Sequence, residues 1–116
     1  FIRHTATTTL MRATATEMRE LGAKMAEKLN RARGPAALLV PLRGFSRYDE
    51  AGGPRAMDFA GNPAGTFHDP ESDMAFLEGV KSTLNQERVR LMEPDLHIND
   101  EAFSKIVAEV FLSLVK

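Results

Sequence analysis

Two polar segments of this sequence have residue types and spacing suited to binding an anion. The first is PLRGFSRYDEAGGP, at residues 41–54. Its arginines can donate charge-assisted hydrogen bonds to phosphate or carboxylate, and its glycines let backbone amides approach such a group closely. The segment matches neither the Walker loop nor the dinucleotide fingerprint. The residues alone therefore leave two readings open, a ligand-binding loop and a plain, solvent-exposed loop rich in turns.

The second segment is EPDLHIND, at residues 93–100. His97 lies near two aspartates, so it could act as a general base or a metal ligand, or it could simply be bonded to a carboxylate at a helix start. A Ser46–His97–Asp nucleophilic arrangement has weak support, because Ser46 lacks the second glycine of the Gly-x-Ser-x-Gly turn. The three histidines are far apart and there is no cysteine, so we expect no metal site. His68 has no partner at a useful spacing and is expected to be exposed.

Three helices and two strands are predicted to position these segments. A helix over about residues 15–33 begins at Thr14 and ends at Gly34-Pro35. Gly22 within it predicts a close backbone neighbour. A second helix begins at Asp69-Pro70, and a third begins at Asn99 as its cap. The apolar residues expected to be buried are Met18, Leu21, Met25 and Leu29 in the first helix, Met74, Leu77, Val80 and Leu84 in the second, and Phe103, Ile106, Val107, Val110, Phe111 and Leu114 in the third.

The apolar run at residues 36–40 is typical of a strand buried on both faces, and residues 88–92 form the second predicted strand. A strand–helix–strand order implies a parallel pair, hence an α/β fold with a small, mostly parallel sheet flanked by helices. Residues 43–66 are expected to be one long Gly-rich loop. The Thr-rich segment 4–10 is either extended or loop. Two strands are too few for an independent sheet, so we expect an incomplete part of a larger two-lobed domain, or a homodimer.

Composition narrows the class of protein. The chain has 116 residues, a formal net charge of −1 and no cysteine, which fits one soluble lobe in a reducing compartment such as the cytoplasm. No apolar run is long enough for a membrane span, and the basic residues of the first helix are expected to face water. We therefore expect neither a membrane nor a nucleic acid as partner. The start, FIRH, lacks an initiator Met, so we read residues 1–116 as one lobe of a longer polypeptide.

Four segments in order resemble the C-terminal part of the tomato mosaic virus resistance protein family. They are LMRATATE (residues 10–17), PLRGFS (41–46) with Asp49 and Gly52, DPESD (69–73), and HIND (97–100) with Phe103. The resemblance covers nearly the whole chain, although residues 53–66 are longer than the family pattern. It implies a two-lobed α/β domain that binds ATP in its plant member, with the N-terminal lobe of the parent chain as a partner. An antiviral role does not transfer on such a resemblance.

These observations predict a lobe that binds a nucleotide or another phosphorylated small molecule, with ATP and magnesium as the candidate ligand and no cofactor required for folding. The predicted ligand-binding residues are Arg43, Gly44, Ser46, Asp49, Gly52, Gly53, His97, Asn99 and Asp100. Two alternatives stay open. One is an enzyme acting on a small carboxylate or phosphate ester, with His97 as its acid/base. The other is an assembly module without a ligand.

Overall fold

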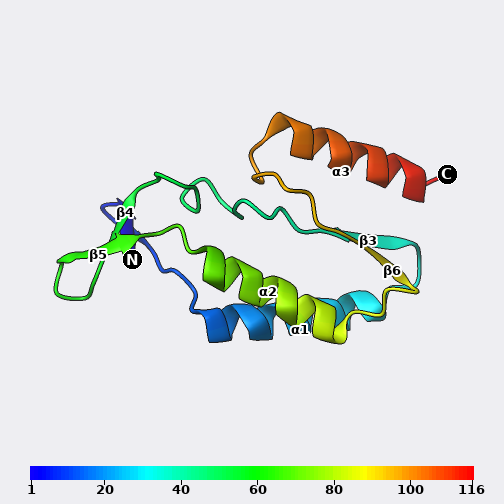
Figure 1. Ribbon diagram of the computed structural model, residues 1–116, viewed down its shortest axis with the longest axis horizontal. Helices are drawn as coiled ribbons and strands as arrows, with labels where there is room; N and C mark the ends of the chain where they lie inside the picture. Colours follow the sequence, from blue (N-terminus) through cyan, green and yellow to red (C-terminus); the bar gives the residue numbers. More distant parts are fainter.

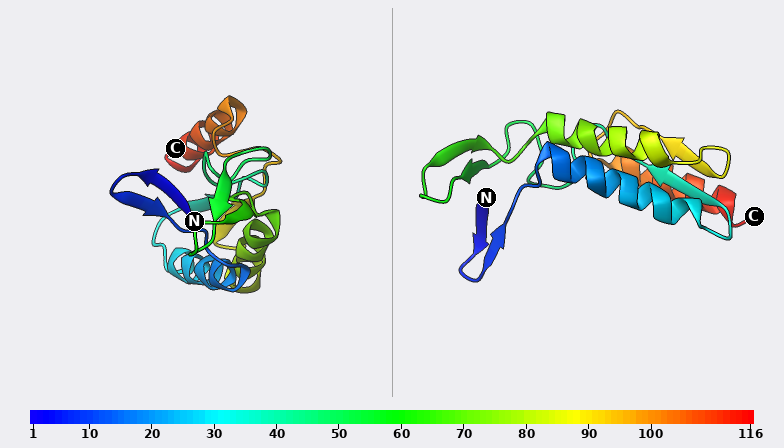
Figure 2. Two further views of the ribbon diagram at one scale, coloured as in Figure 1. Left: turned by 90° about the vertical axis from the view of Figure 1, so that its left-hand side faces the viewer. Right: turned by 90° about the horizontal axis from the view of Figure 1, so that it is seen from below.

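A small parallel sheet lies between two layers of helix in the computed structural model, which describes residues 1–116. Helices α1 (Ala15–Asn30) and α2 (Pro70–Thr83) run side by side below strands β3 (Ala36–Leu39) and β6 (Val89–Met92). Helix α3 (Glu101–Leu114) lies on the other side of these strands (Figures 1 and 2). The predicted α/β class and the three helices are confirmed.

Strands β3 and β6 pair in parallel, with Ala36 opposite Val89 and Leu39 opposite Met92. The predicted parallel pair is therefore confirmed, and both strands end at the same edge of the sheet. The buried core between the sheet and the two helices is formed by Ala26, Val80, Leu84 and Val89. These apolar side chains set the register, because a shift by one residue would turn Val89 out of the core.

Helices α1 and α2 approach each other closely at two glycines. A Cβ atom on Gly22 would lie 2.1 Å from the Phe76 carbonyl oxygen, and one on Gly79 would lie 2.0 Å from the Arg19 carbonyl oxygen. The close neighbour predicted for Gly22 is therefore the backbone of α2. At the far ends of the helices, Asn30 donates to the Thr83 carbonyl and accepts from the Asn85 amide, which ties the pair together.

The close approach changes which faces of the helices are buried. Met18, Gly22 and Ala26 form the buried stripe of α1, whereas Leu21 and Met25 are exposed, contrary to the sequence prediction. A backbone contact needs small residues, so the larger side chains are displaced to the flank. In α2, Leu77, Val80 and Leu84 are buried as predicted, but Met74 is 48% exposed. In α3, only Phe103 and Val110 are buried.

The helix caps follow the sequence signals, with one exception. The Thr14 side chain accepts from the Glu17 amide, and the Asp69 side chain accepts from the Ser72 amide ahead of Pro70. The third helix is capped by Asp100 rather than by Asn99. Asp100 uses its carboxylate to accept from the His97 amide 2.8 Å away, so it fixes the preceding loop instead of the first helical turn.

Two antiparallel hairpins extend from the helical layers (Figure 2). Strands β1 (Ile2–Thr5) and β2 (Thr8–Leu10) show that the Thr-rich segment is extended, but in a sheet of its own. Strands β4 (Arg55–Met57) and β5 (Pro63–Thr66) lie within residues 43–66, so the prediction of one long loop there was wrong. The Asp58 carboxylate accepts from the Ala60 and Asn62 amides and closes the turn, a local signal that apolar periodicity does not carry.

None of the three helices combines the length and the apolar character that crossing a bilayer would require.

Candidate anion-binding rim

The segments that follow β3 and β6 join at the carboxyl edge of the sheet. The Arg43 amide donates to the Leu96 carbonyl at 3.0 Å, and the Ile98 amide donates to the Gly44 carbonyl at 3.1 Å. We call these joined segments, residues 41–53 and 93–100, the rim. Ligands of open α/β sheets bind beyond the carboxyl ends of strands, so the rim occupies the position where such a site is expected.

His97 is the link between the two segments of the rim. It is 7% exposed, its Nε2 lies 3.0 Å from the carbonyl oxygens of both Ser46 and Asp49, and its Nδ1 accepts from the Asn99 amide. These partners require a neutral ring with its proton on Nε2. Since both nitrogens are engaged with backbone, the geometry gives His97 a structural task and does not favour the acid/base alternative.

Gly44 makes this contact possible. Its φ angle is +140°, and an added Cβ would lie 1.9 Å from the Asp49 carbonyl oxygen and 2.8 Å from the His97 ring. Only glycine fits a position that combines such a backbone with such neighbours. Gly44 is thus a packing requirement of the rim and is buried, so it presents little surface to a ligand.

Arg43 is the exposed cation of the rim. Its guanidinium forms two hydrogen bonds with the Asp95 carboxylate, at 3.1 and 3.2 Å, and these bonds lower the pKa of Asp95. Both side chains are largely exposed, so the pair adds little to stability. The bonds with Asp95 likewise raise the pKa of Arg43, with a smaller contribution from the charge of Asp100, the residue before α3. The backbone of Arg43 and Gly44 is bonded to residues 96 and 98, which lead into α3, and the positive end of a helix dipole favours anions.

Asp49 points inward, to the side of its loop away from solvent. It is 1% exposed, and its carboxylate accepts from the Phe45 amide at 3.0 Å and from His68 Nδ1 at 2.9 Å. Its neighbour Asp73 is bonded to the Arg12 guanidinium. We call Arg12, Asp49, His68 and Asp73 the inner cluster. It joins the segment before α1, the rim and the start of α2.

The inner cluster holds two carboxylates in unequal states. Burial, together with the adjacent Asp49, raises the pKa of Asp73 to about 7 in spite of Arg12. Burial acts in the same direction on Asp49, but the contacts with Asp73, the Phe45 amide and His68 outweigh it and lower the pKa of Asp49. Asp49 therefore carries the negative charge of the pair, and Asp73 takes up a proton more readily.

The structure brings most of the predicted ligand residues together but gives them different tasks. Asn99 and Arg43 face solvent, whereas Gly44, Asp49 and His97 are buried in the framework of the rim. Ser46 is half-buried, and its hydroxyl accepts from the Tyr48 amide. Gly52 and Gly53 lie further along the first segment, in a turn closed by a bond from the Gly53 amide to the Glu50 carbonyl.

Sequence reasoning missed three members of the inner cluster. His68 is mostly buried and bonded to Asp49, so the prediction that it is exposed was wrong. Arg12 donates to the carbonyls of Phe67 and Asp69 as well as to Asp73, across more than fifty residues of sequence. No local pattern could reveal these contacts. The nearest signal is the occurrence of Arg12 and Asp73 within two of the family-like segments.

An apolar groove of about 370 Å³ adjoins the rim. Its walls include Pro41, Phe45 and Ile98 of the rim, together with the exposed Leu21 and Met25 of α1. The lining residues are Met18, Leu21, Met25, Leu38, Leu39, Val40, Pro41, Phe45, Phe76 and Ile98. Its volume lies within the range of small-molecule sites, which are mostly apolar with a few polar groups placed at one end.

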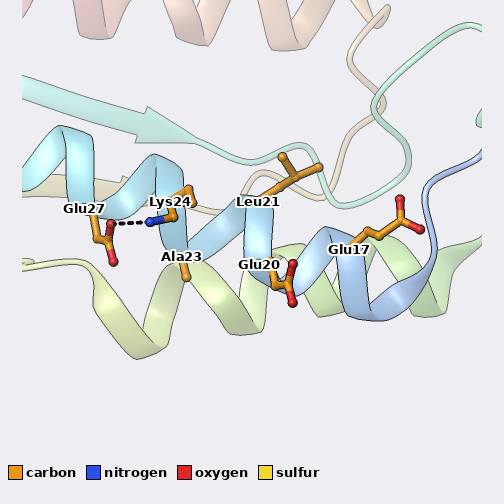
Figure 3. A pocket seen from close by; sticks show the side chains of 6 residues that line it. All are labelled: Glu17, Glu20, Leu21, Ala23, Lys24 and Glu27. Atoms are coloured by element: carbon orange, nitrogen blue, oxygen red, sulfur yellow. Dashed lines mark hydrogen bonds and ion pairs between the residues drawn. The ribbon is translucent and has the colours of Figure 1, made fainter.

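A second hollow lies along the outer surface of α1 (Figure 3). It is lined by Glu17, Glu20, Leu21, Ala23, Lys24 and Glu27, and Lys24 is paired with Glu27. Three carboxylates against one lysine repel a phosphate, and the hollow contains no residue of the rim. We interpret it as the solvated face of the helix.

The sequence is similar to proteins of one uncharacterised family. A family model described as the C-terminal domain of an uncharacterised protein family, UPF0261, matches residues 1–115. The chain is 35% identical over 114 residues to a UPF0261 protein of Clostridium tetani, an alignment covering 98% of this chain and 25% of that protein. It is 34% identical over 110 residues to a UPF0261 protein of Rhizobium meliloti, covering 94% and 25%. It is 30% identical over 112 residues to the ToMV resistance protein Tm-1 of Solanum lycopersicum, covering 96% and 13%.

The fold and the rim define a layered α/β domain whose parallel strands deliver their connecting segments to one edge. The chain belongs to the UPF0261 family, as its C-terminal domain. The resemblance to the tomato resistance proteins is confirmed by the alignment with Tm-1. The chain spans about a quarter of the length of the bacterial relatives and a smaller share of the plant protein.

Proposed function

We propose that this domain binds a phosphorylated small molecule at the rim, with the ligand's apolar part in the adjoining groove. The observation that carries the proposal is the joining of two strand-exit segments, one with the exposed Arg43 and the other leading into α3. A guanidinium, the amides of a helix start and a nearby apolar groove are together suited to a nucleotide, and ATP with Mg²⁺ is the candidate.

The ligand in this proposal touches fewer residues than the sequence indicated. Arg43 and Asn99 would contact it, since both side chains are exposed, together with the amides of the first two residues of α3. Gly44, Asp49 and His97 would support the site by holding the two segments of the rim in place. Asp95 competes with the ligand for Arg43, because the two side chains are already paired.

Replacing Arg43 by Ala tests the proposal. In the full-length protein of which we expect this domain to be part, Arg43→Ala should weaken binding of Mg·ATP by about tenfold or more, as hydrogen bonds to charged groups contribute about 1.5–3 kcal/mol. Isothermal titration calorimetry measures the effect. Arg33→Ala, which removes an exposed arginine just after α1, is the control and should leave the affinity unchanged.

Two further measurements sharpen this test. Asp95→Asn should strengthen binding, because it frees Arg43 from its carboxylate partner. Titration with inorganic pyrophosphate separates the contribution of the phosphates from that of the groove. No heat signal with millimolar Mg·ATP, or equal affinities for Arg43→Ala and the parent protein, would exclude the rim as the phosphate site.

The uncovered apolar surface supports a second proposal, that the domain packs against other parts of a longer chain or against a second copy. Phe111, Leu112 and Val115 of the C-terminal helix region are each about 60% exposed. The groove likewise leaves Leu21 and Met25 open to solvent. Monomeric proteins seldom expose apolar patches of this kind without a partner.

Light scattering distinguishes the two kinds of partner. If another part of a longer chain covers these side chains, that longer protein should be monomeric and Phe111→Ser should destabilise it without changing its mass in solution. If a second copy covers them, the parent protein should be a dimer that Phe111→Ser dissociates. A monomer whose stability is unaffected by Phe111→Ser would contradict both forms of the proposal.

A further inference from the structure

Three potential metal ligands meet inside the molecule, away from the solvent side of the rim. Asp49 comes from the segment after β3, His68 follows β5, and Asp73 lies in the first turn of α2. Each offers one donor atom, and these three atoms all lie within 4.8 Å of one another. Three separate chain segments therefore converge on one point.

A second observation points to a ligand at this place. Asp73 is only 5% exposed, yet its Oδ2 atom has no hydrogen-bond partner. A buried polar atom without a partner is destabilising, and nearly all such atoms in folded proteins are paired. The other oxygen, Oδ1, is held by the Arg12 guanidinium. When Asp73 is ionised, Oδ2 is thus an oxygen that no protein group engages and that an ion can bind, whereas a protonated Asp73 bonds to Asp49 instead.

The spacing of the other two ligands fits a metal ion. His68 Nδ1 and Asp49 Oδ1 lie 2.9 Å apart in a hydrogen bond that the ion would replace, with the ring proton then on Nε2. Adjacent ligands of a six-coordinate ion with bonds of about 2.1 Å are separated by about 3 Å. The second oxygen of Asp49 accepts from the Phe45 amide, so the carboxylate is oriented with Oδ1 toward His68.

We propose that Asp49, His68 and Asp73 form a binding site for a divalent transition-metal ion such as Zn²⁺ or Mn²⁺. One imidazole nitrogen with two carboxylate oxygens is a donor set that such ions accept, whereas Mg²⁺ favours oxygen ligands alone. Three protein ligands leave coordination positions for water. The site is independent of the proposed phosphate ligand, because none of the three side chains belongs to the solvent face of the rim.

Arg12 is compatible with this site and accounts for its charge. With both carboxylates ionised, the two carboxylates and one guanidinium carry a net charge of −1, so a divalent ion brings the cluster to +1 and releases any proton held by Asp73. Arg12 also fixes Asp73 through Oδ1 and thereby directs Oδ2 to the ion. The side chains of Arg12 and His68 are each 18% exposed, which gives an ion a route from solvent.

Zinc titration of the full-length protein tests the proposal. After treatment with a chelator, the parent protein should bind one equivalent of Zn²⁺ in calorimetry. The variants Asp73→Asn and His68→Gln should each lose this binding or bind Zn²⁺ at least about tenfold more weakly. The matched controls are Glu109→Gln, an exposed carboxylate on α3, and His4→Gln, an exposed histidine in β1. Both should retain the affinity and stoichiometry of the parent.

A direct measurement keeps the test decisive if a variant fails to fold. Crystals of the parent protein soaked in zinc chloride should show an anomalous scattering peak between the three side chains. The absence of that peak overturns the proposal, as does an unchanged zinc stoichiometry in folded Asp73→Asn and His68→Gln. Because Arg43→Ala does not touch the inner cluster, failure of phosphate binding and failure of metal binding are distinguishable.

Discussion

Replacing Gly44 by Ala should disrupt the rim and lower the free energy of unfolding by about 3 kcal/mol or more. The new Cβ would lie 1.9 Å from the Asp49 carbonyl oxygen, and the φ angle of +140° is unfavourable for alanine. Backbone strain and overpacking each contribute about 1–3 kcal/mol. The chain must relieve the clash by moving residue 44 away from both the Asp49 carbonyl and the His97 ring. Urea denaturation followed by circular dichroism measures the loss.

Gly52→Ala is the matched control for Gly44→Ala. Gly52 also has a positive φ angle, +76°, but no atom lies within 4 Å of the position of its Cβ. Alanine there incurs only the left-handed backbone cost of about 1–2 kcal/mol. A clearly larger loss for Gly44→Ala than for Gly52→Ala isolates the contact with Asp49 and His97. Equal losses would mean that the two segments of the rim do not pack as described.

The joining of the two rim segments was predictable from the sequence. The apolar run at residues 36–40 and the run at 88–92 were identified as strands, and a helix between them requires a parallel pair. Parallel strands end at the same edge, so Gly44 and His97 had to lie near each other. Local patterning and one topological rule were sufficient for this part of the site.

The inner cluster was not predictable in the same way. Arg12 and Asp73 are 61 residues apart, and Asp49 and His68 are 19 residues apart. Their meeting depends on the hairpin formed by β4 and β5, which returns the chain to the start of α2. That hairpin lacks apolar alternation and rests on the Asp58 turn and on glycines. Side-chain chemistry between distant segments leaves little trace in one sequence.

The buried face of α1 shows a different limit. Apolar periodicity selected the large residues Leu21 and Met25, whereas the helix contact uses Gly22 and Ala26. Small residues allow two helix backbones to approach closely. A prediction based on hydrophobicity alone does not identify such residues as buried, because they are less hydrophobic than Leu or Met. The displaced side chains then line the groove beside the rim. The close approach at Gly22 and Gly79 therefore determines both the packing of α1 on α2 and the apolar surface exposed to a ligand or partner.

Gly79→Ala tests that dependence and should destabilise the domain by about 2 kcal/mol, even though alanine favours a helix by about 1 kcal/mol over glycine. Its Cβ would lie 2.0 Å from the Arg19 carbonyl oxygen, so α2 must move away from α1. The movement reduces contacts of the core residues Ala26 and Val80. The change in the free energy of unfolding, measured in urea, gives the effect.

Gly34→Ala is the control, because Gly34 has open space around its Cβ position and no positive φ angle. It should be nearly neutral. The double variant Gly22→Ala/Gly79→Ala should lose less than the sum of the single losses, because helices already separated by one methyl group leave room for the other. Additive losses would mean that the two clashes are relieved independently. If Gly79→Ala were more stable than the parent protein, helix propensity would outweigh the backbone contact. The close packing of α1 on α2 would then be incorrect.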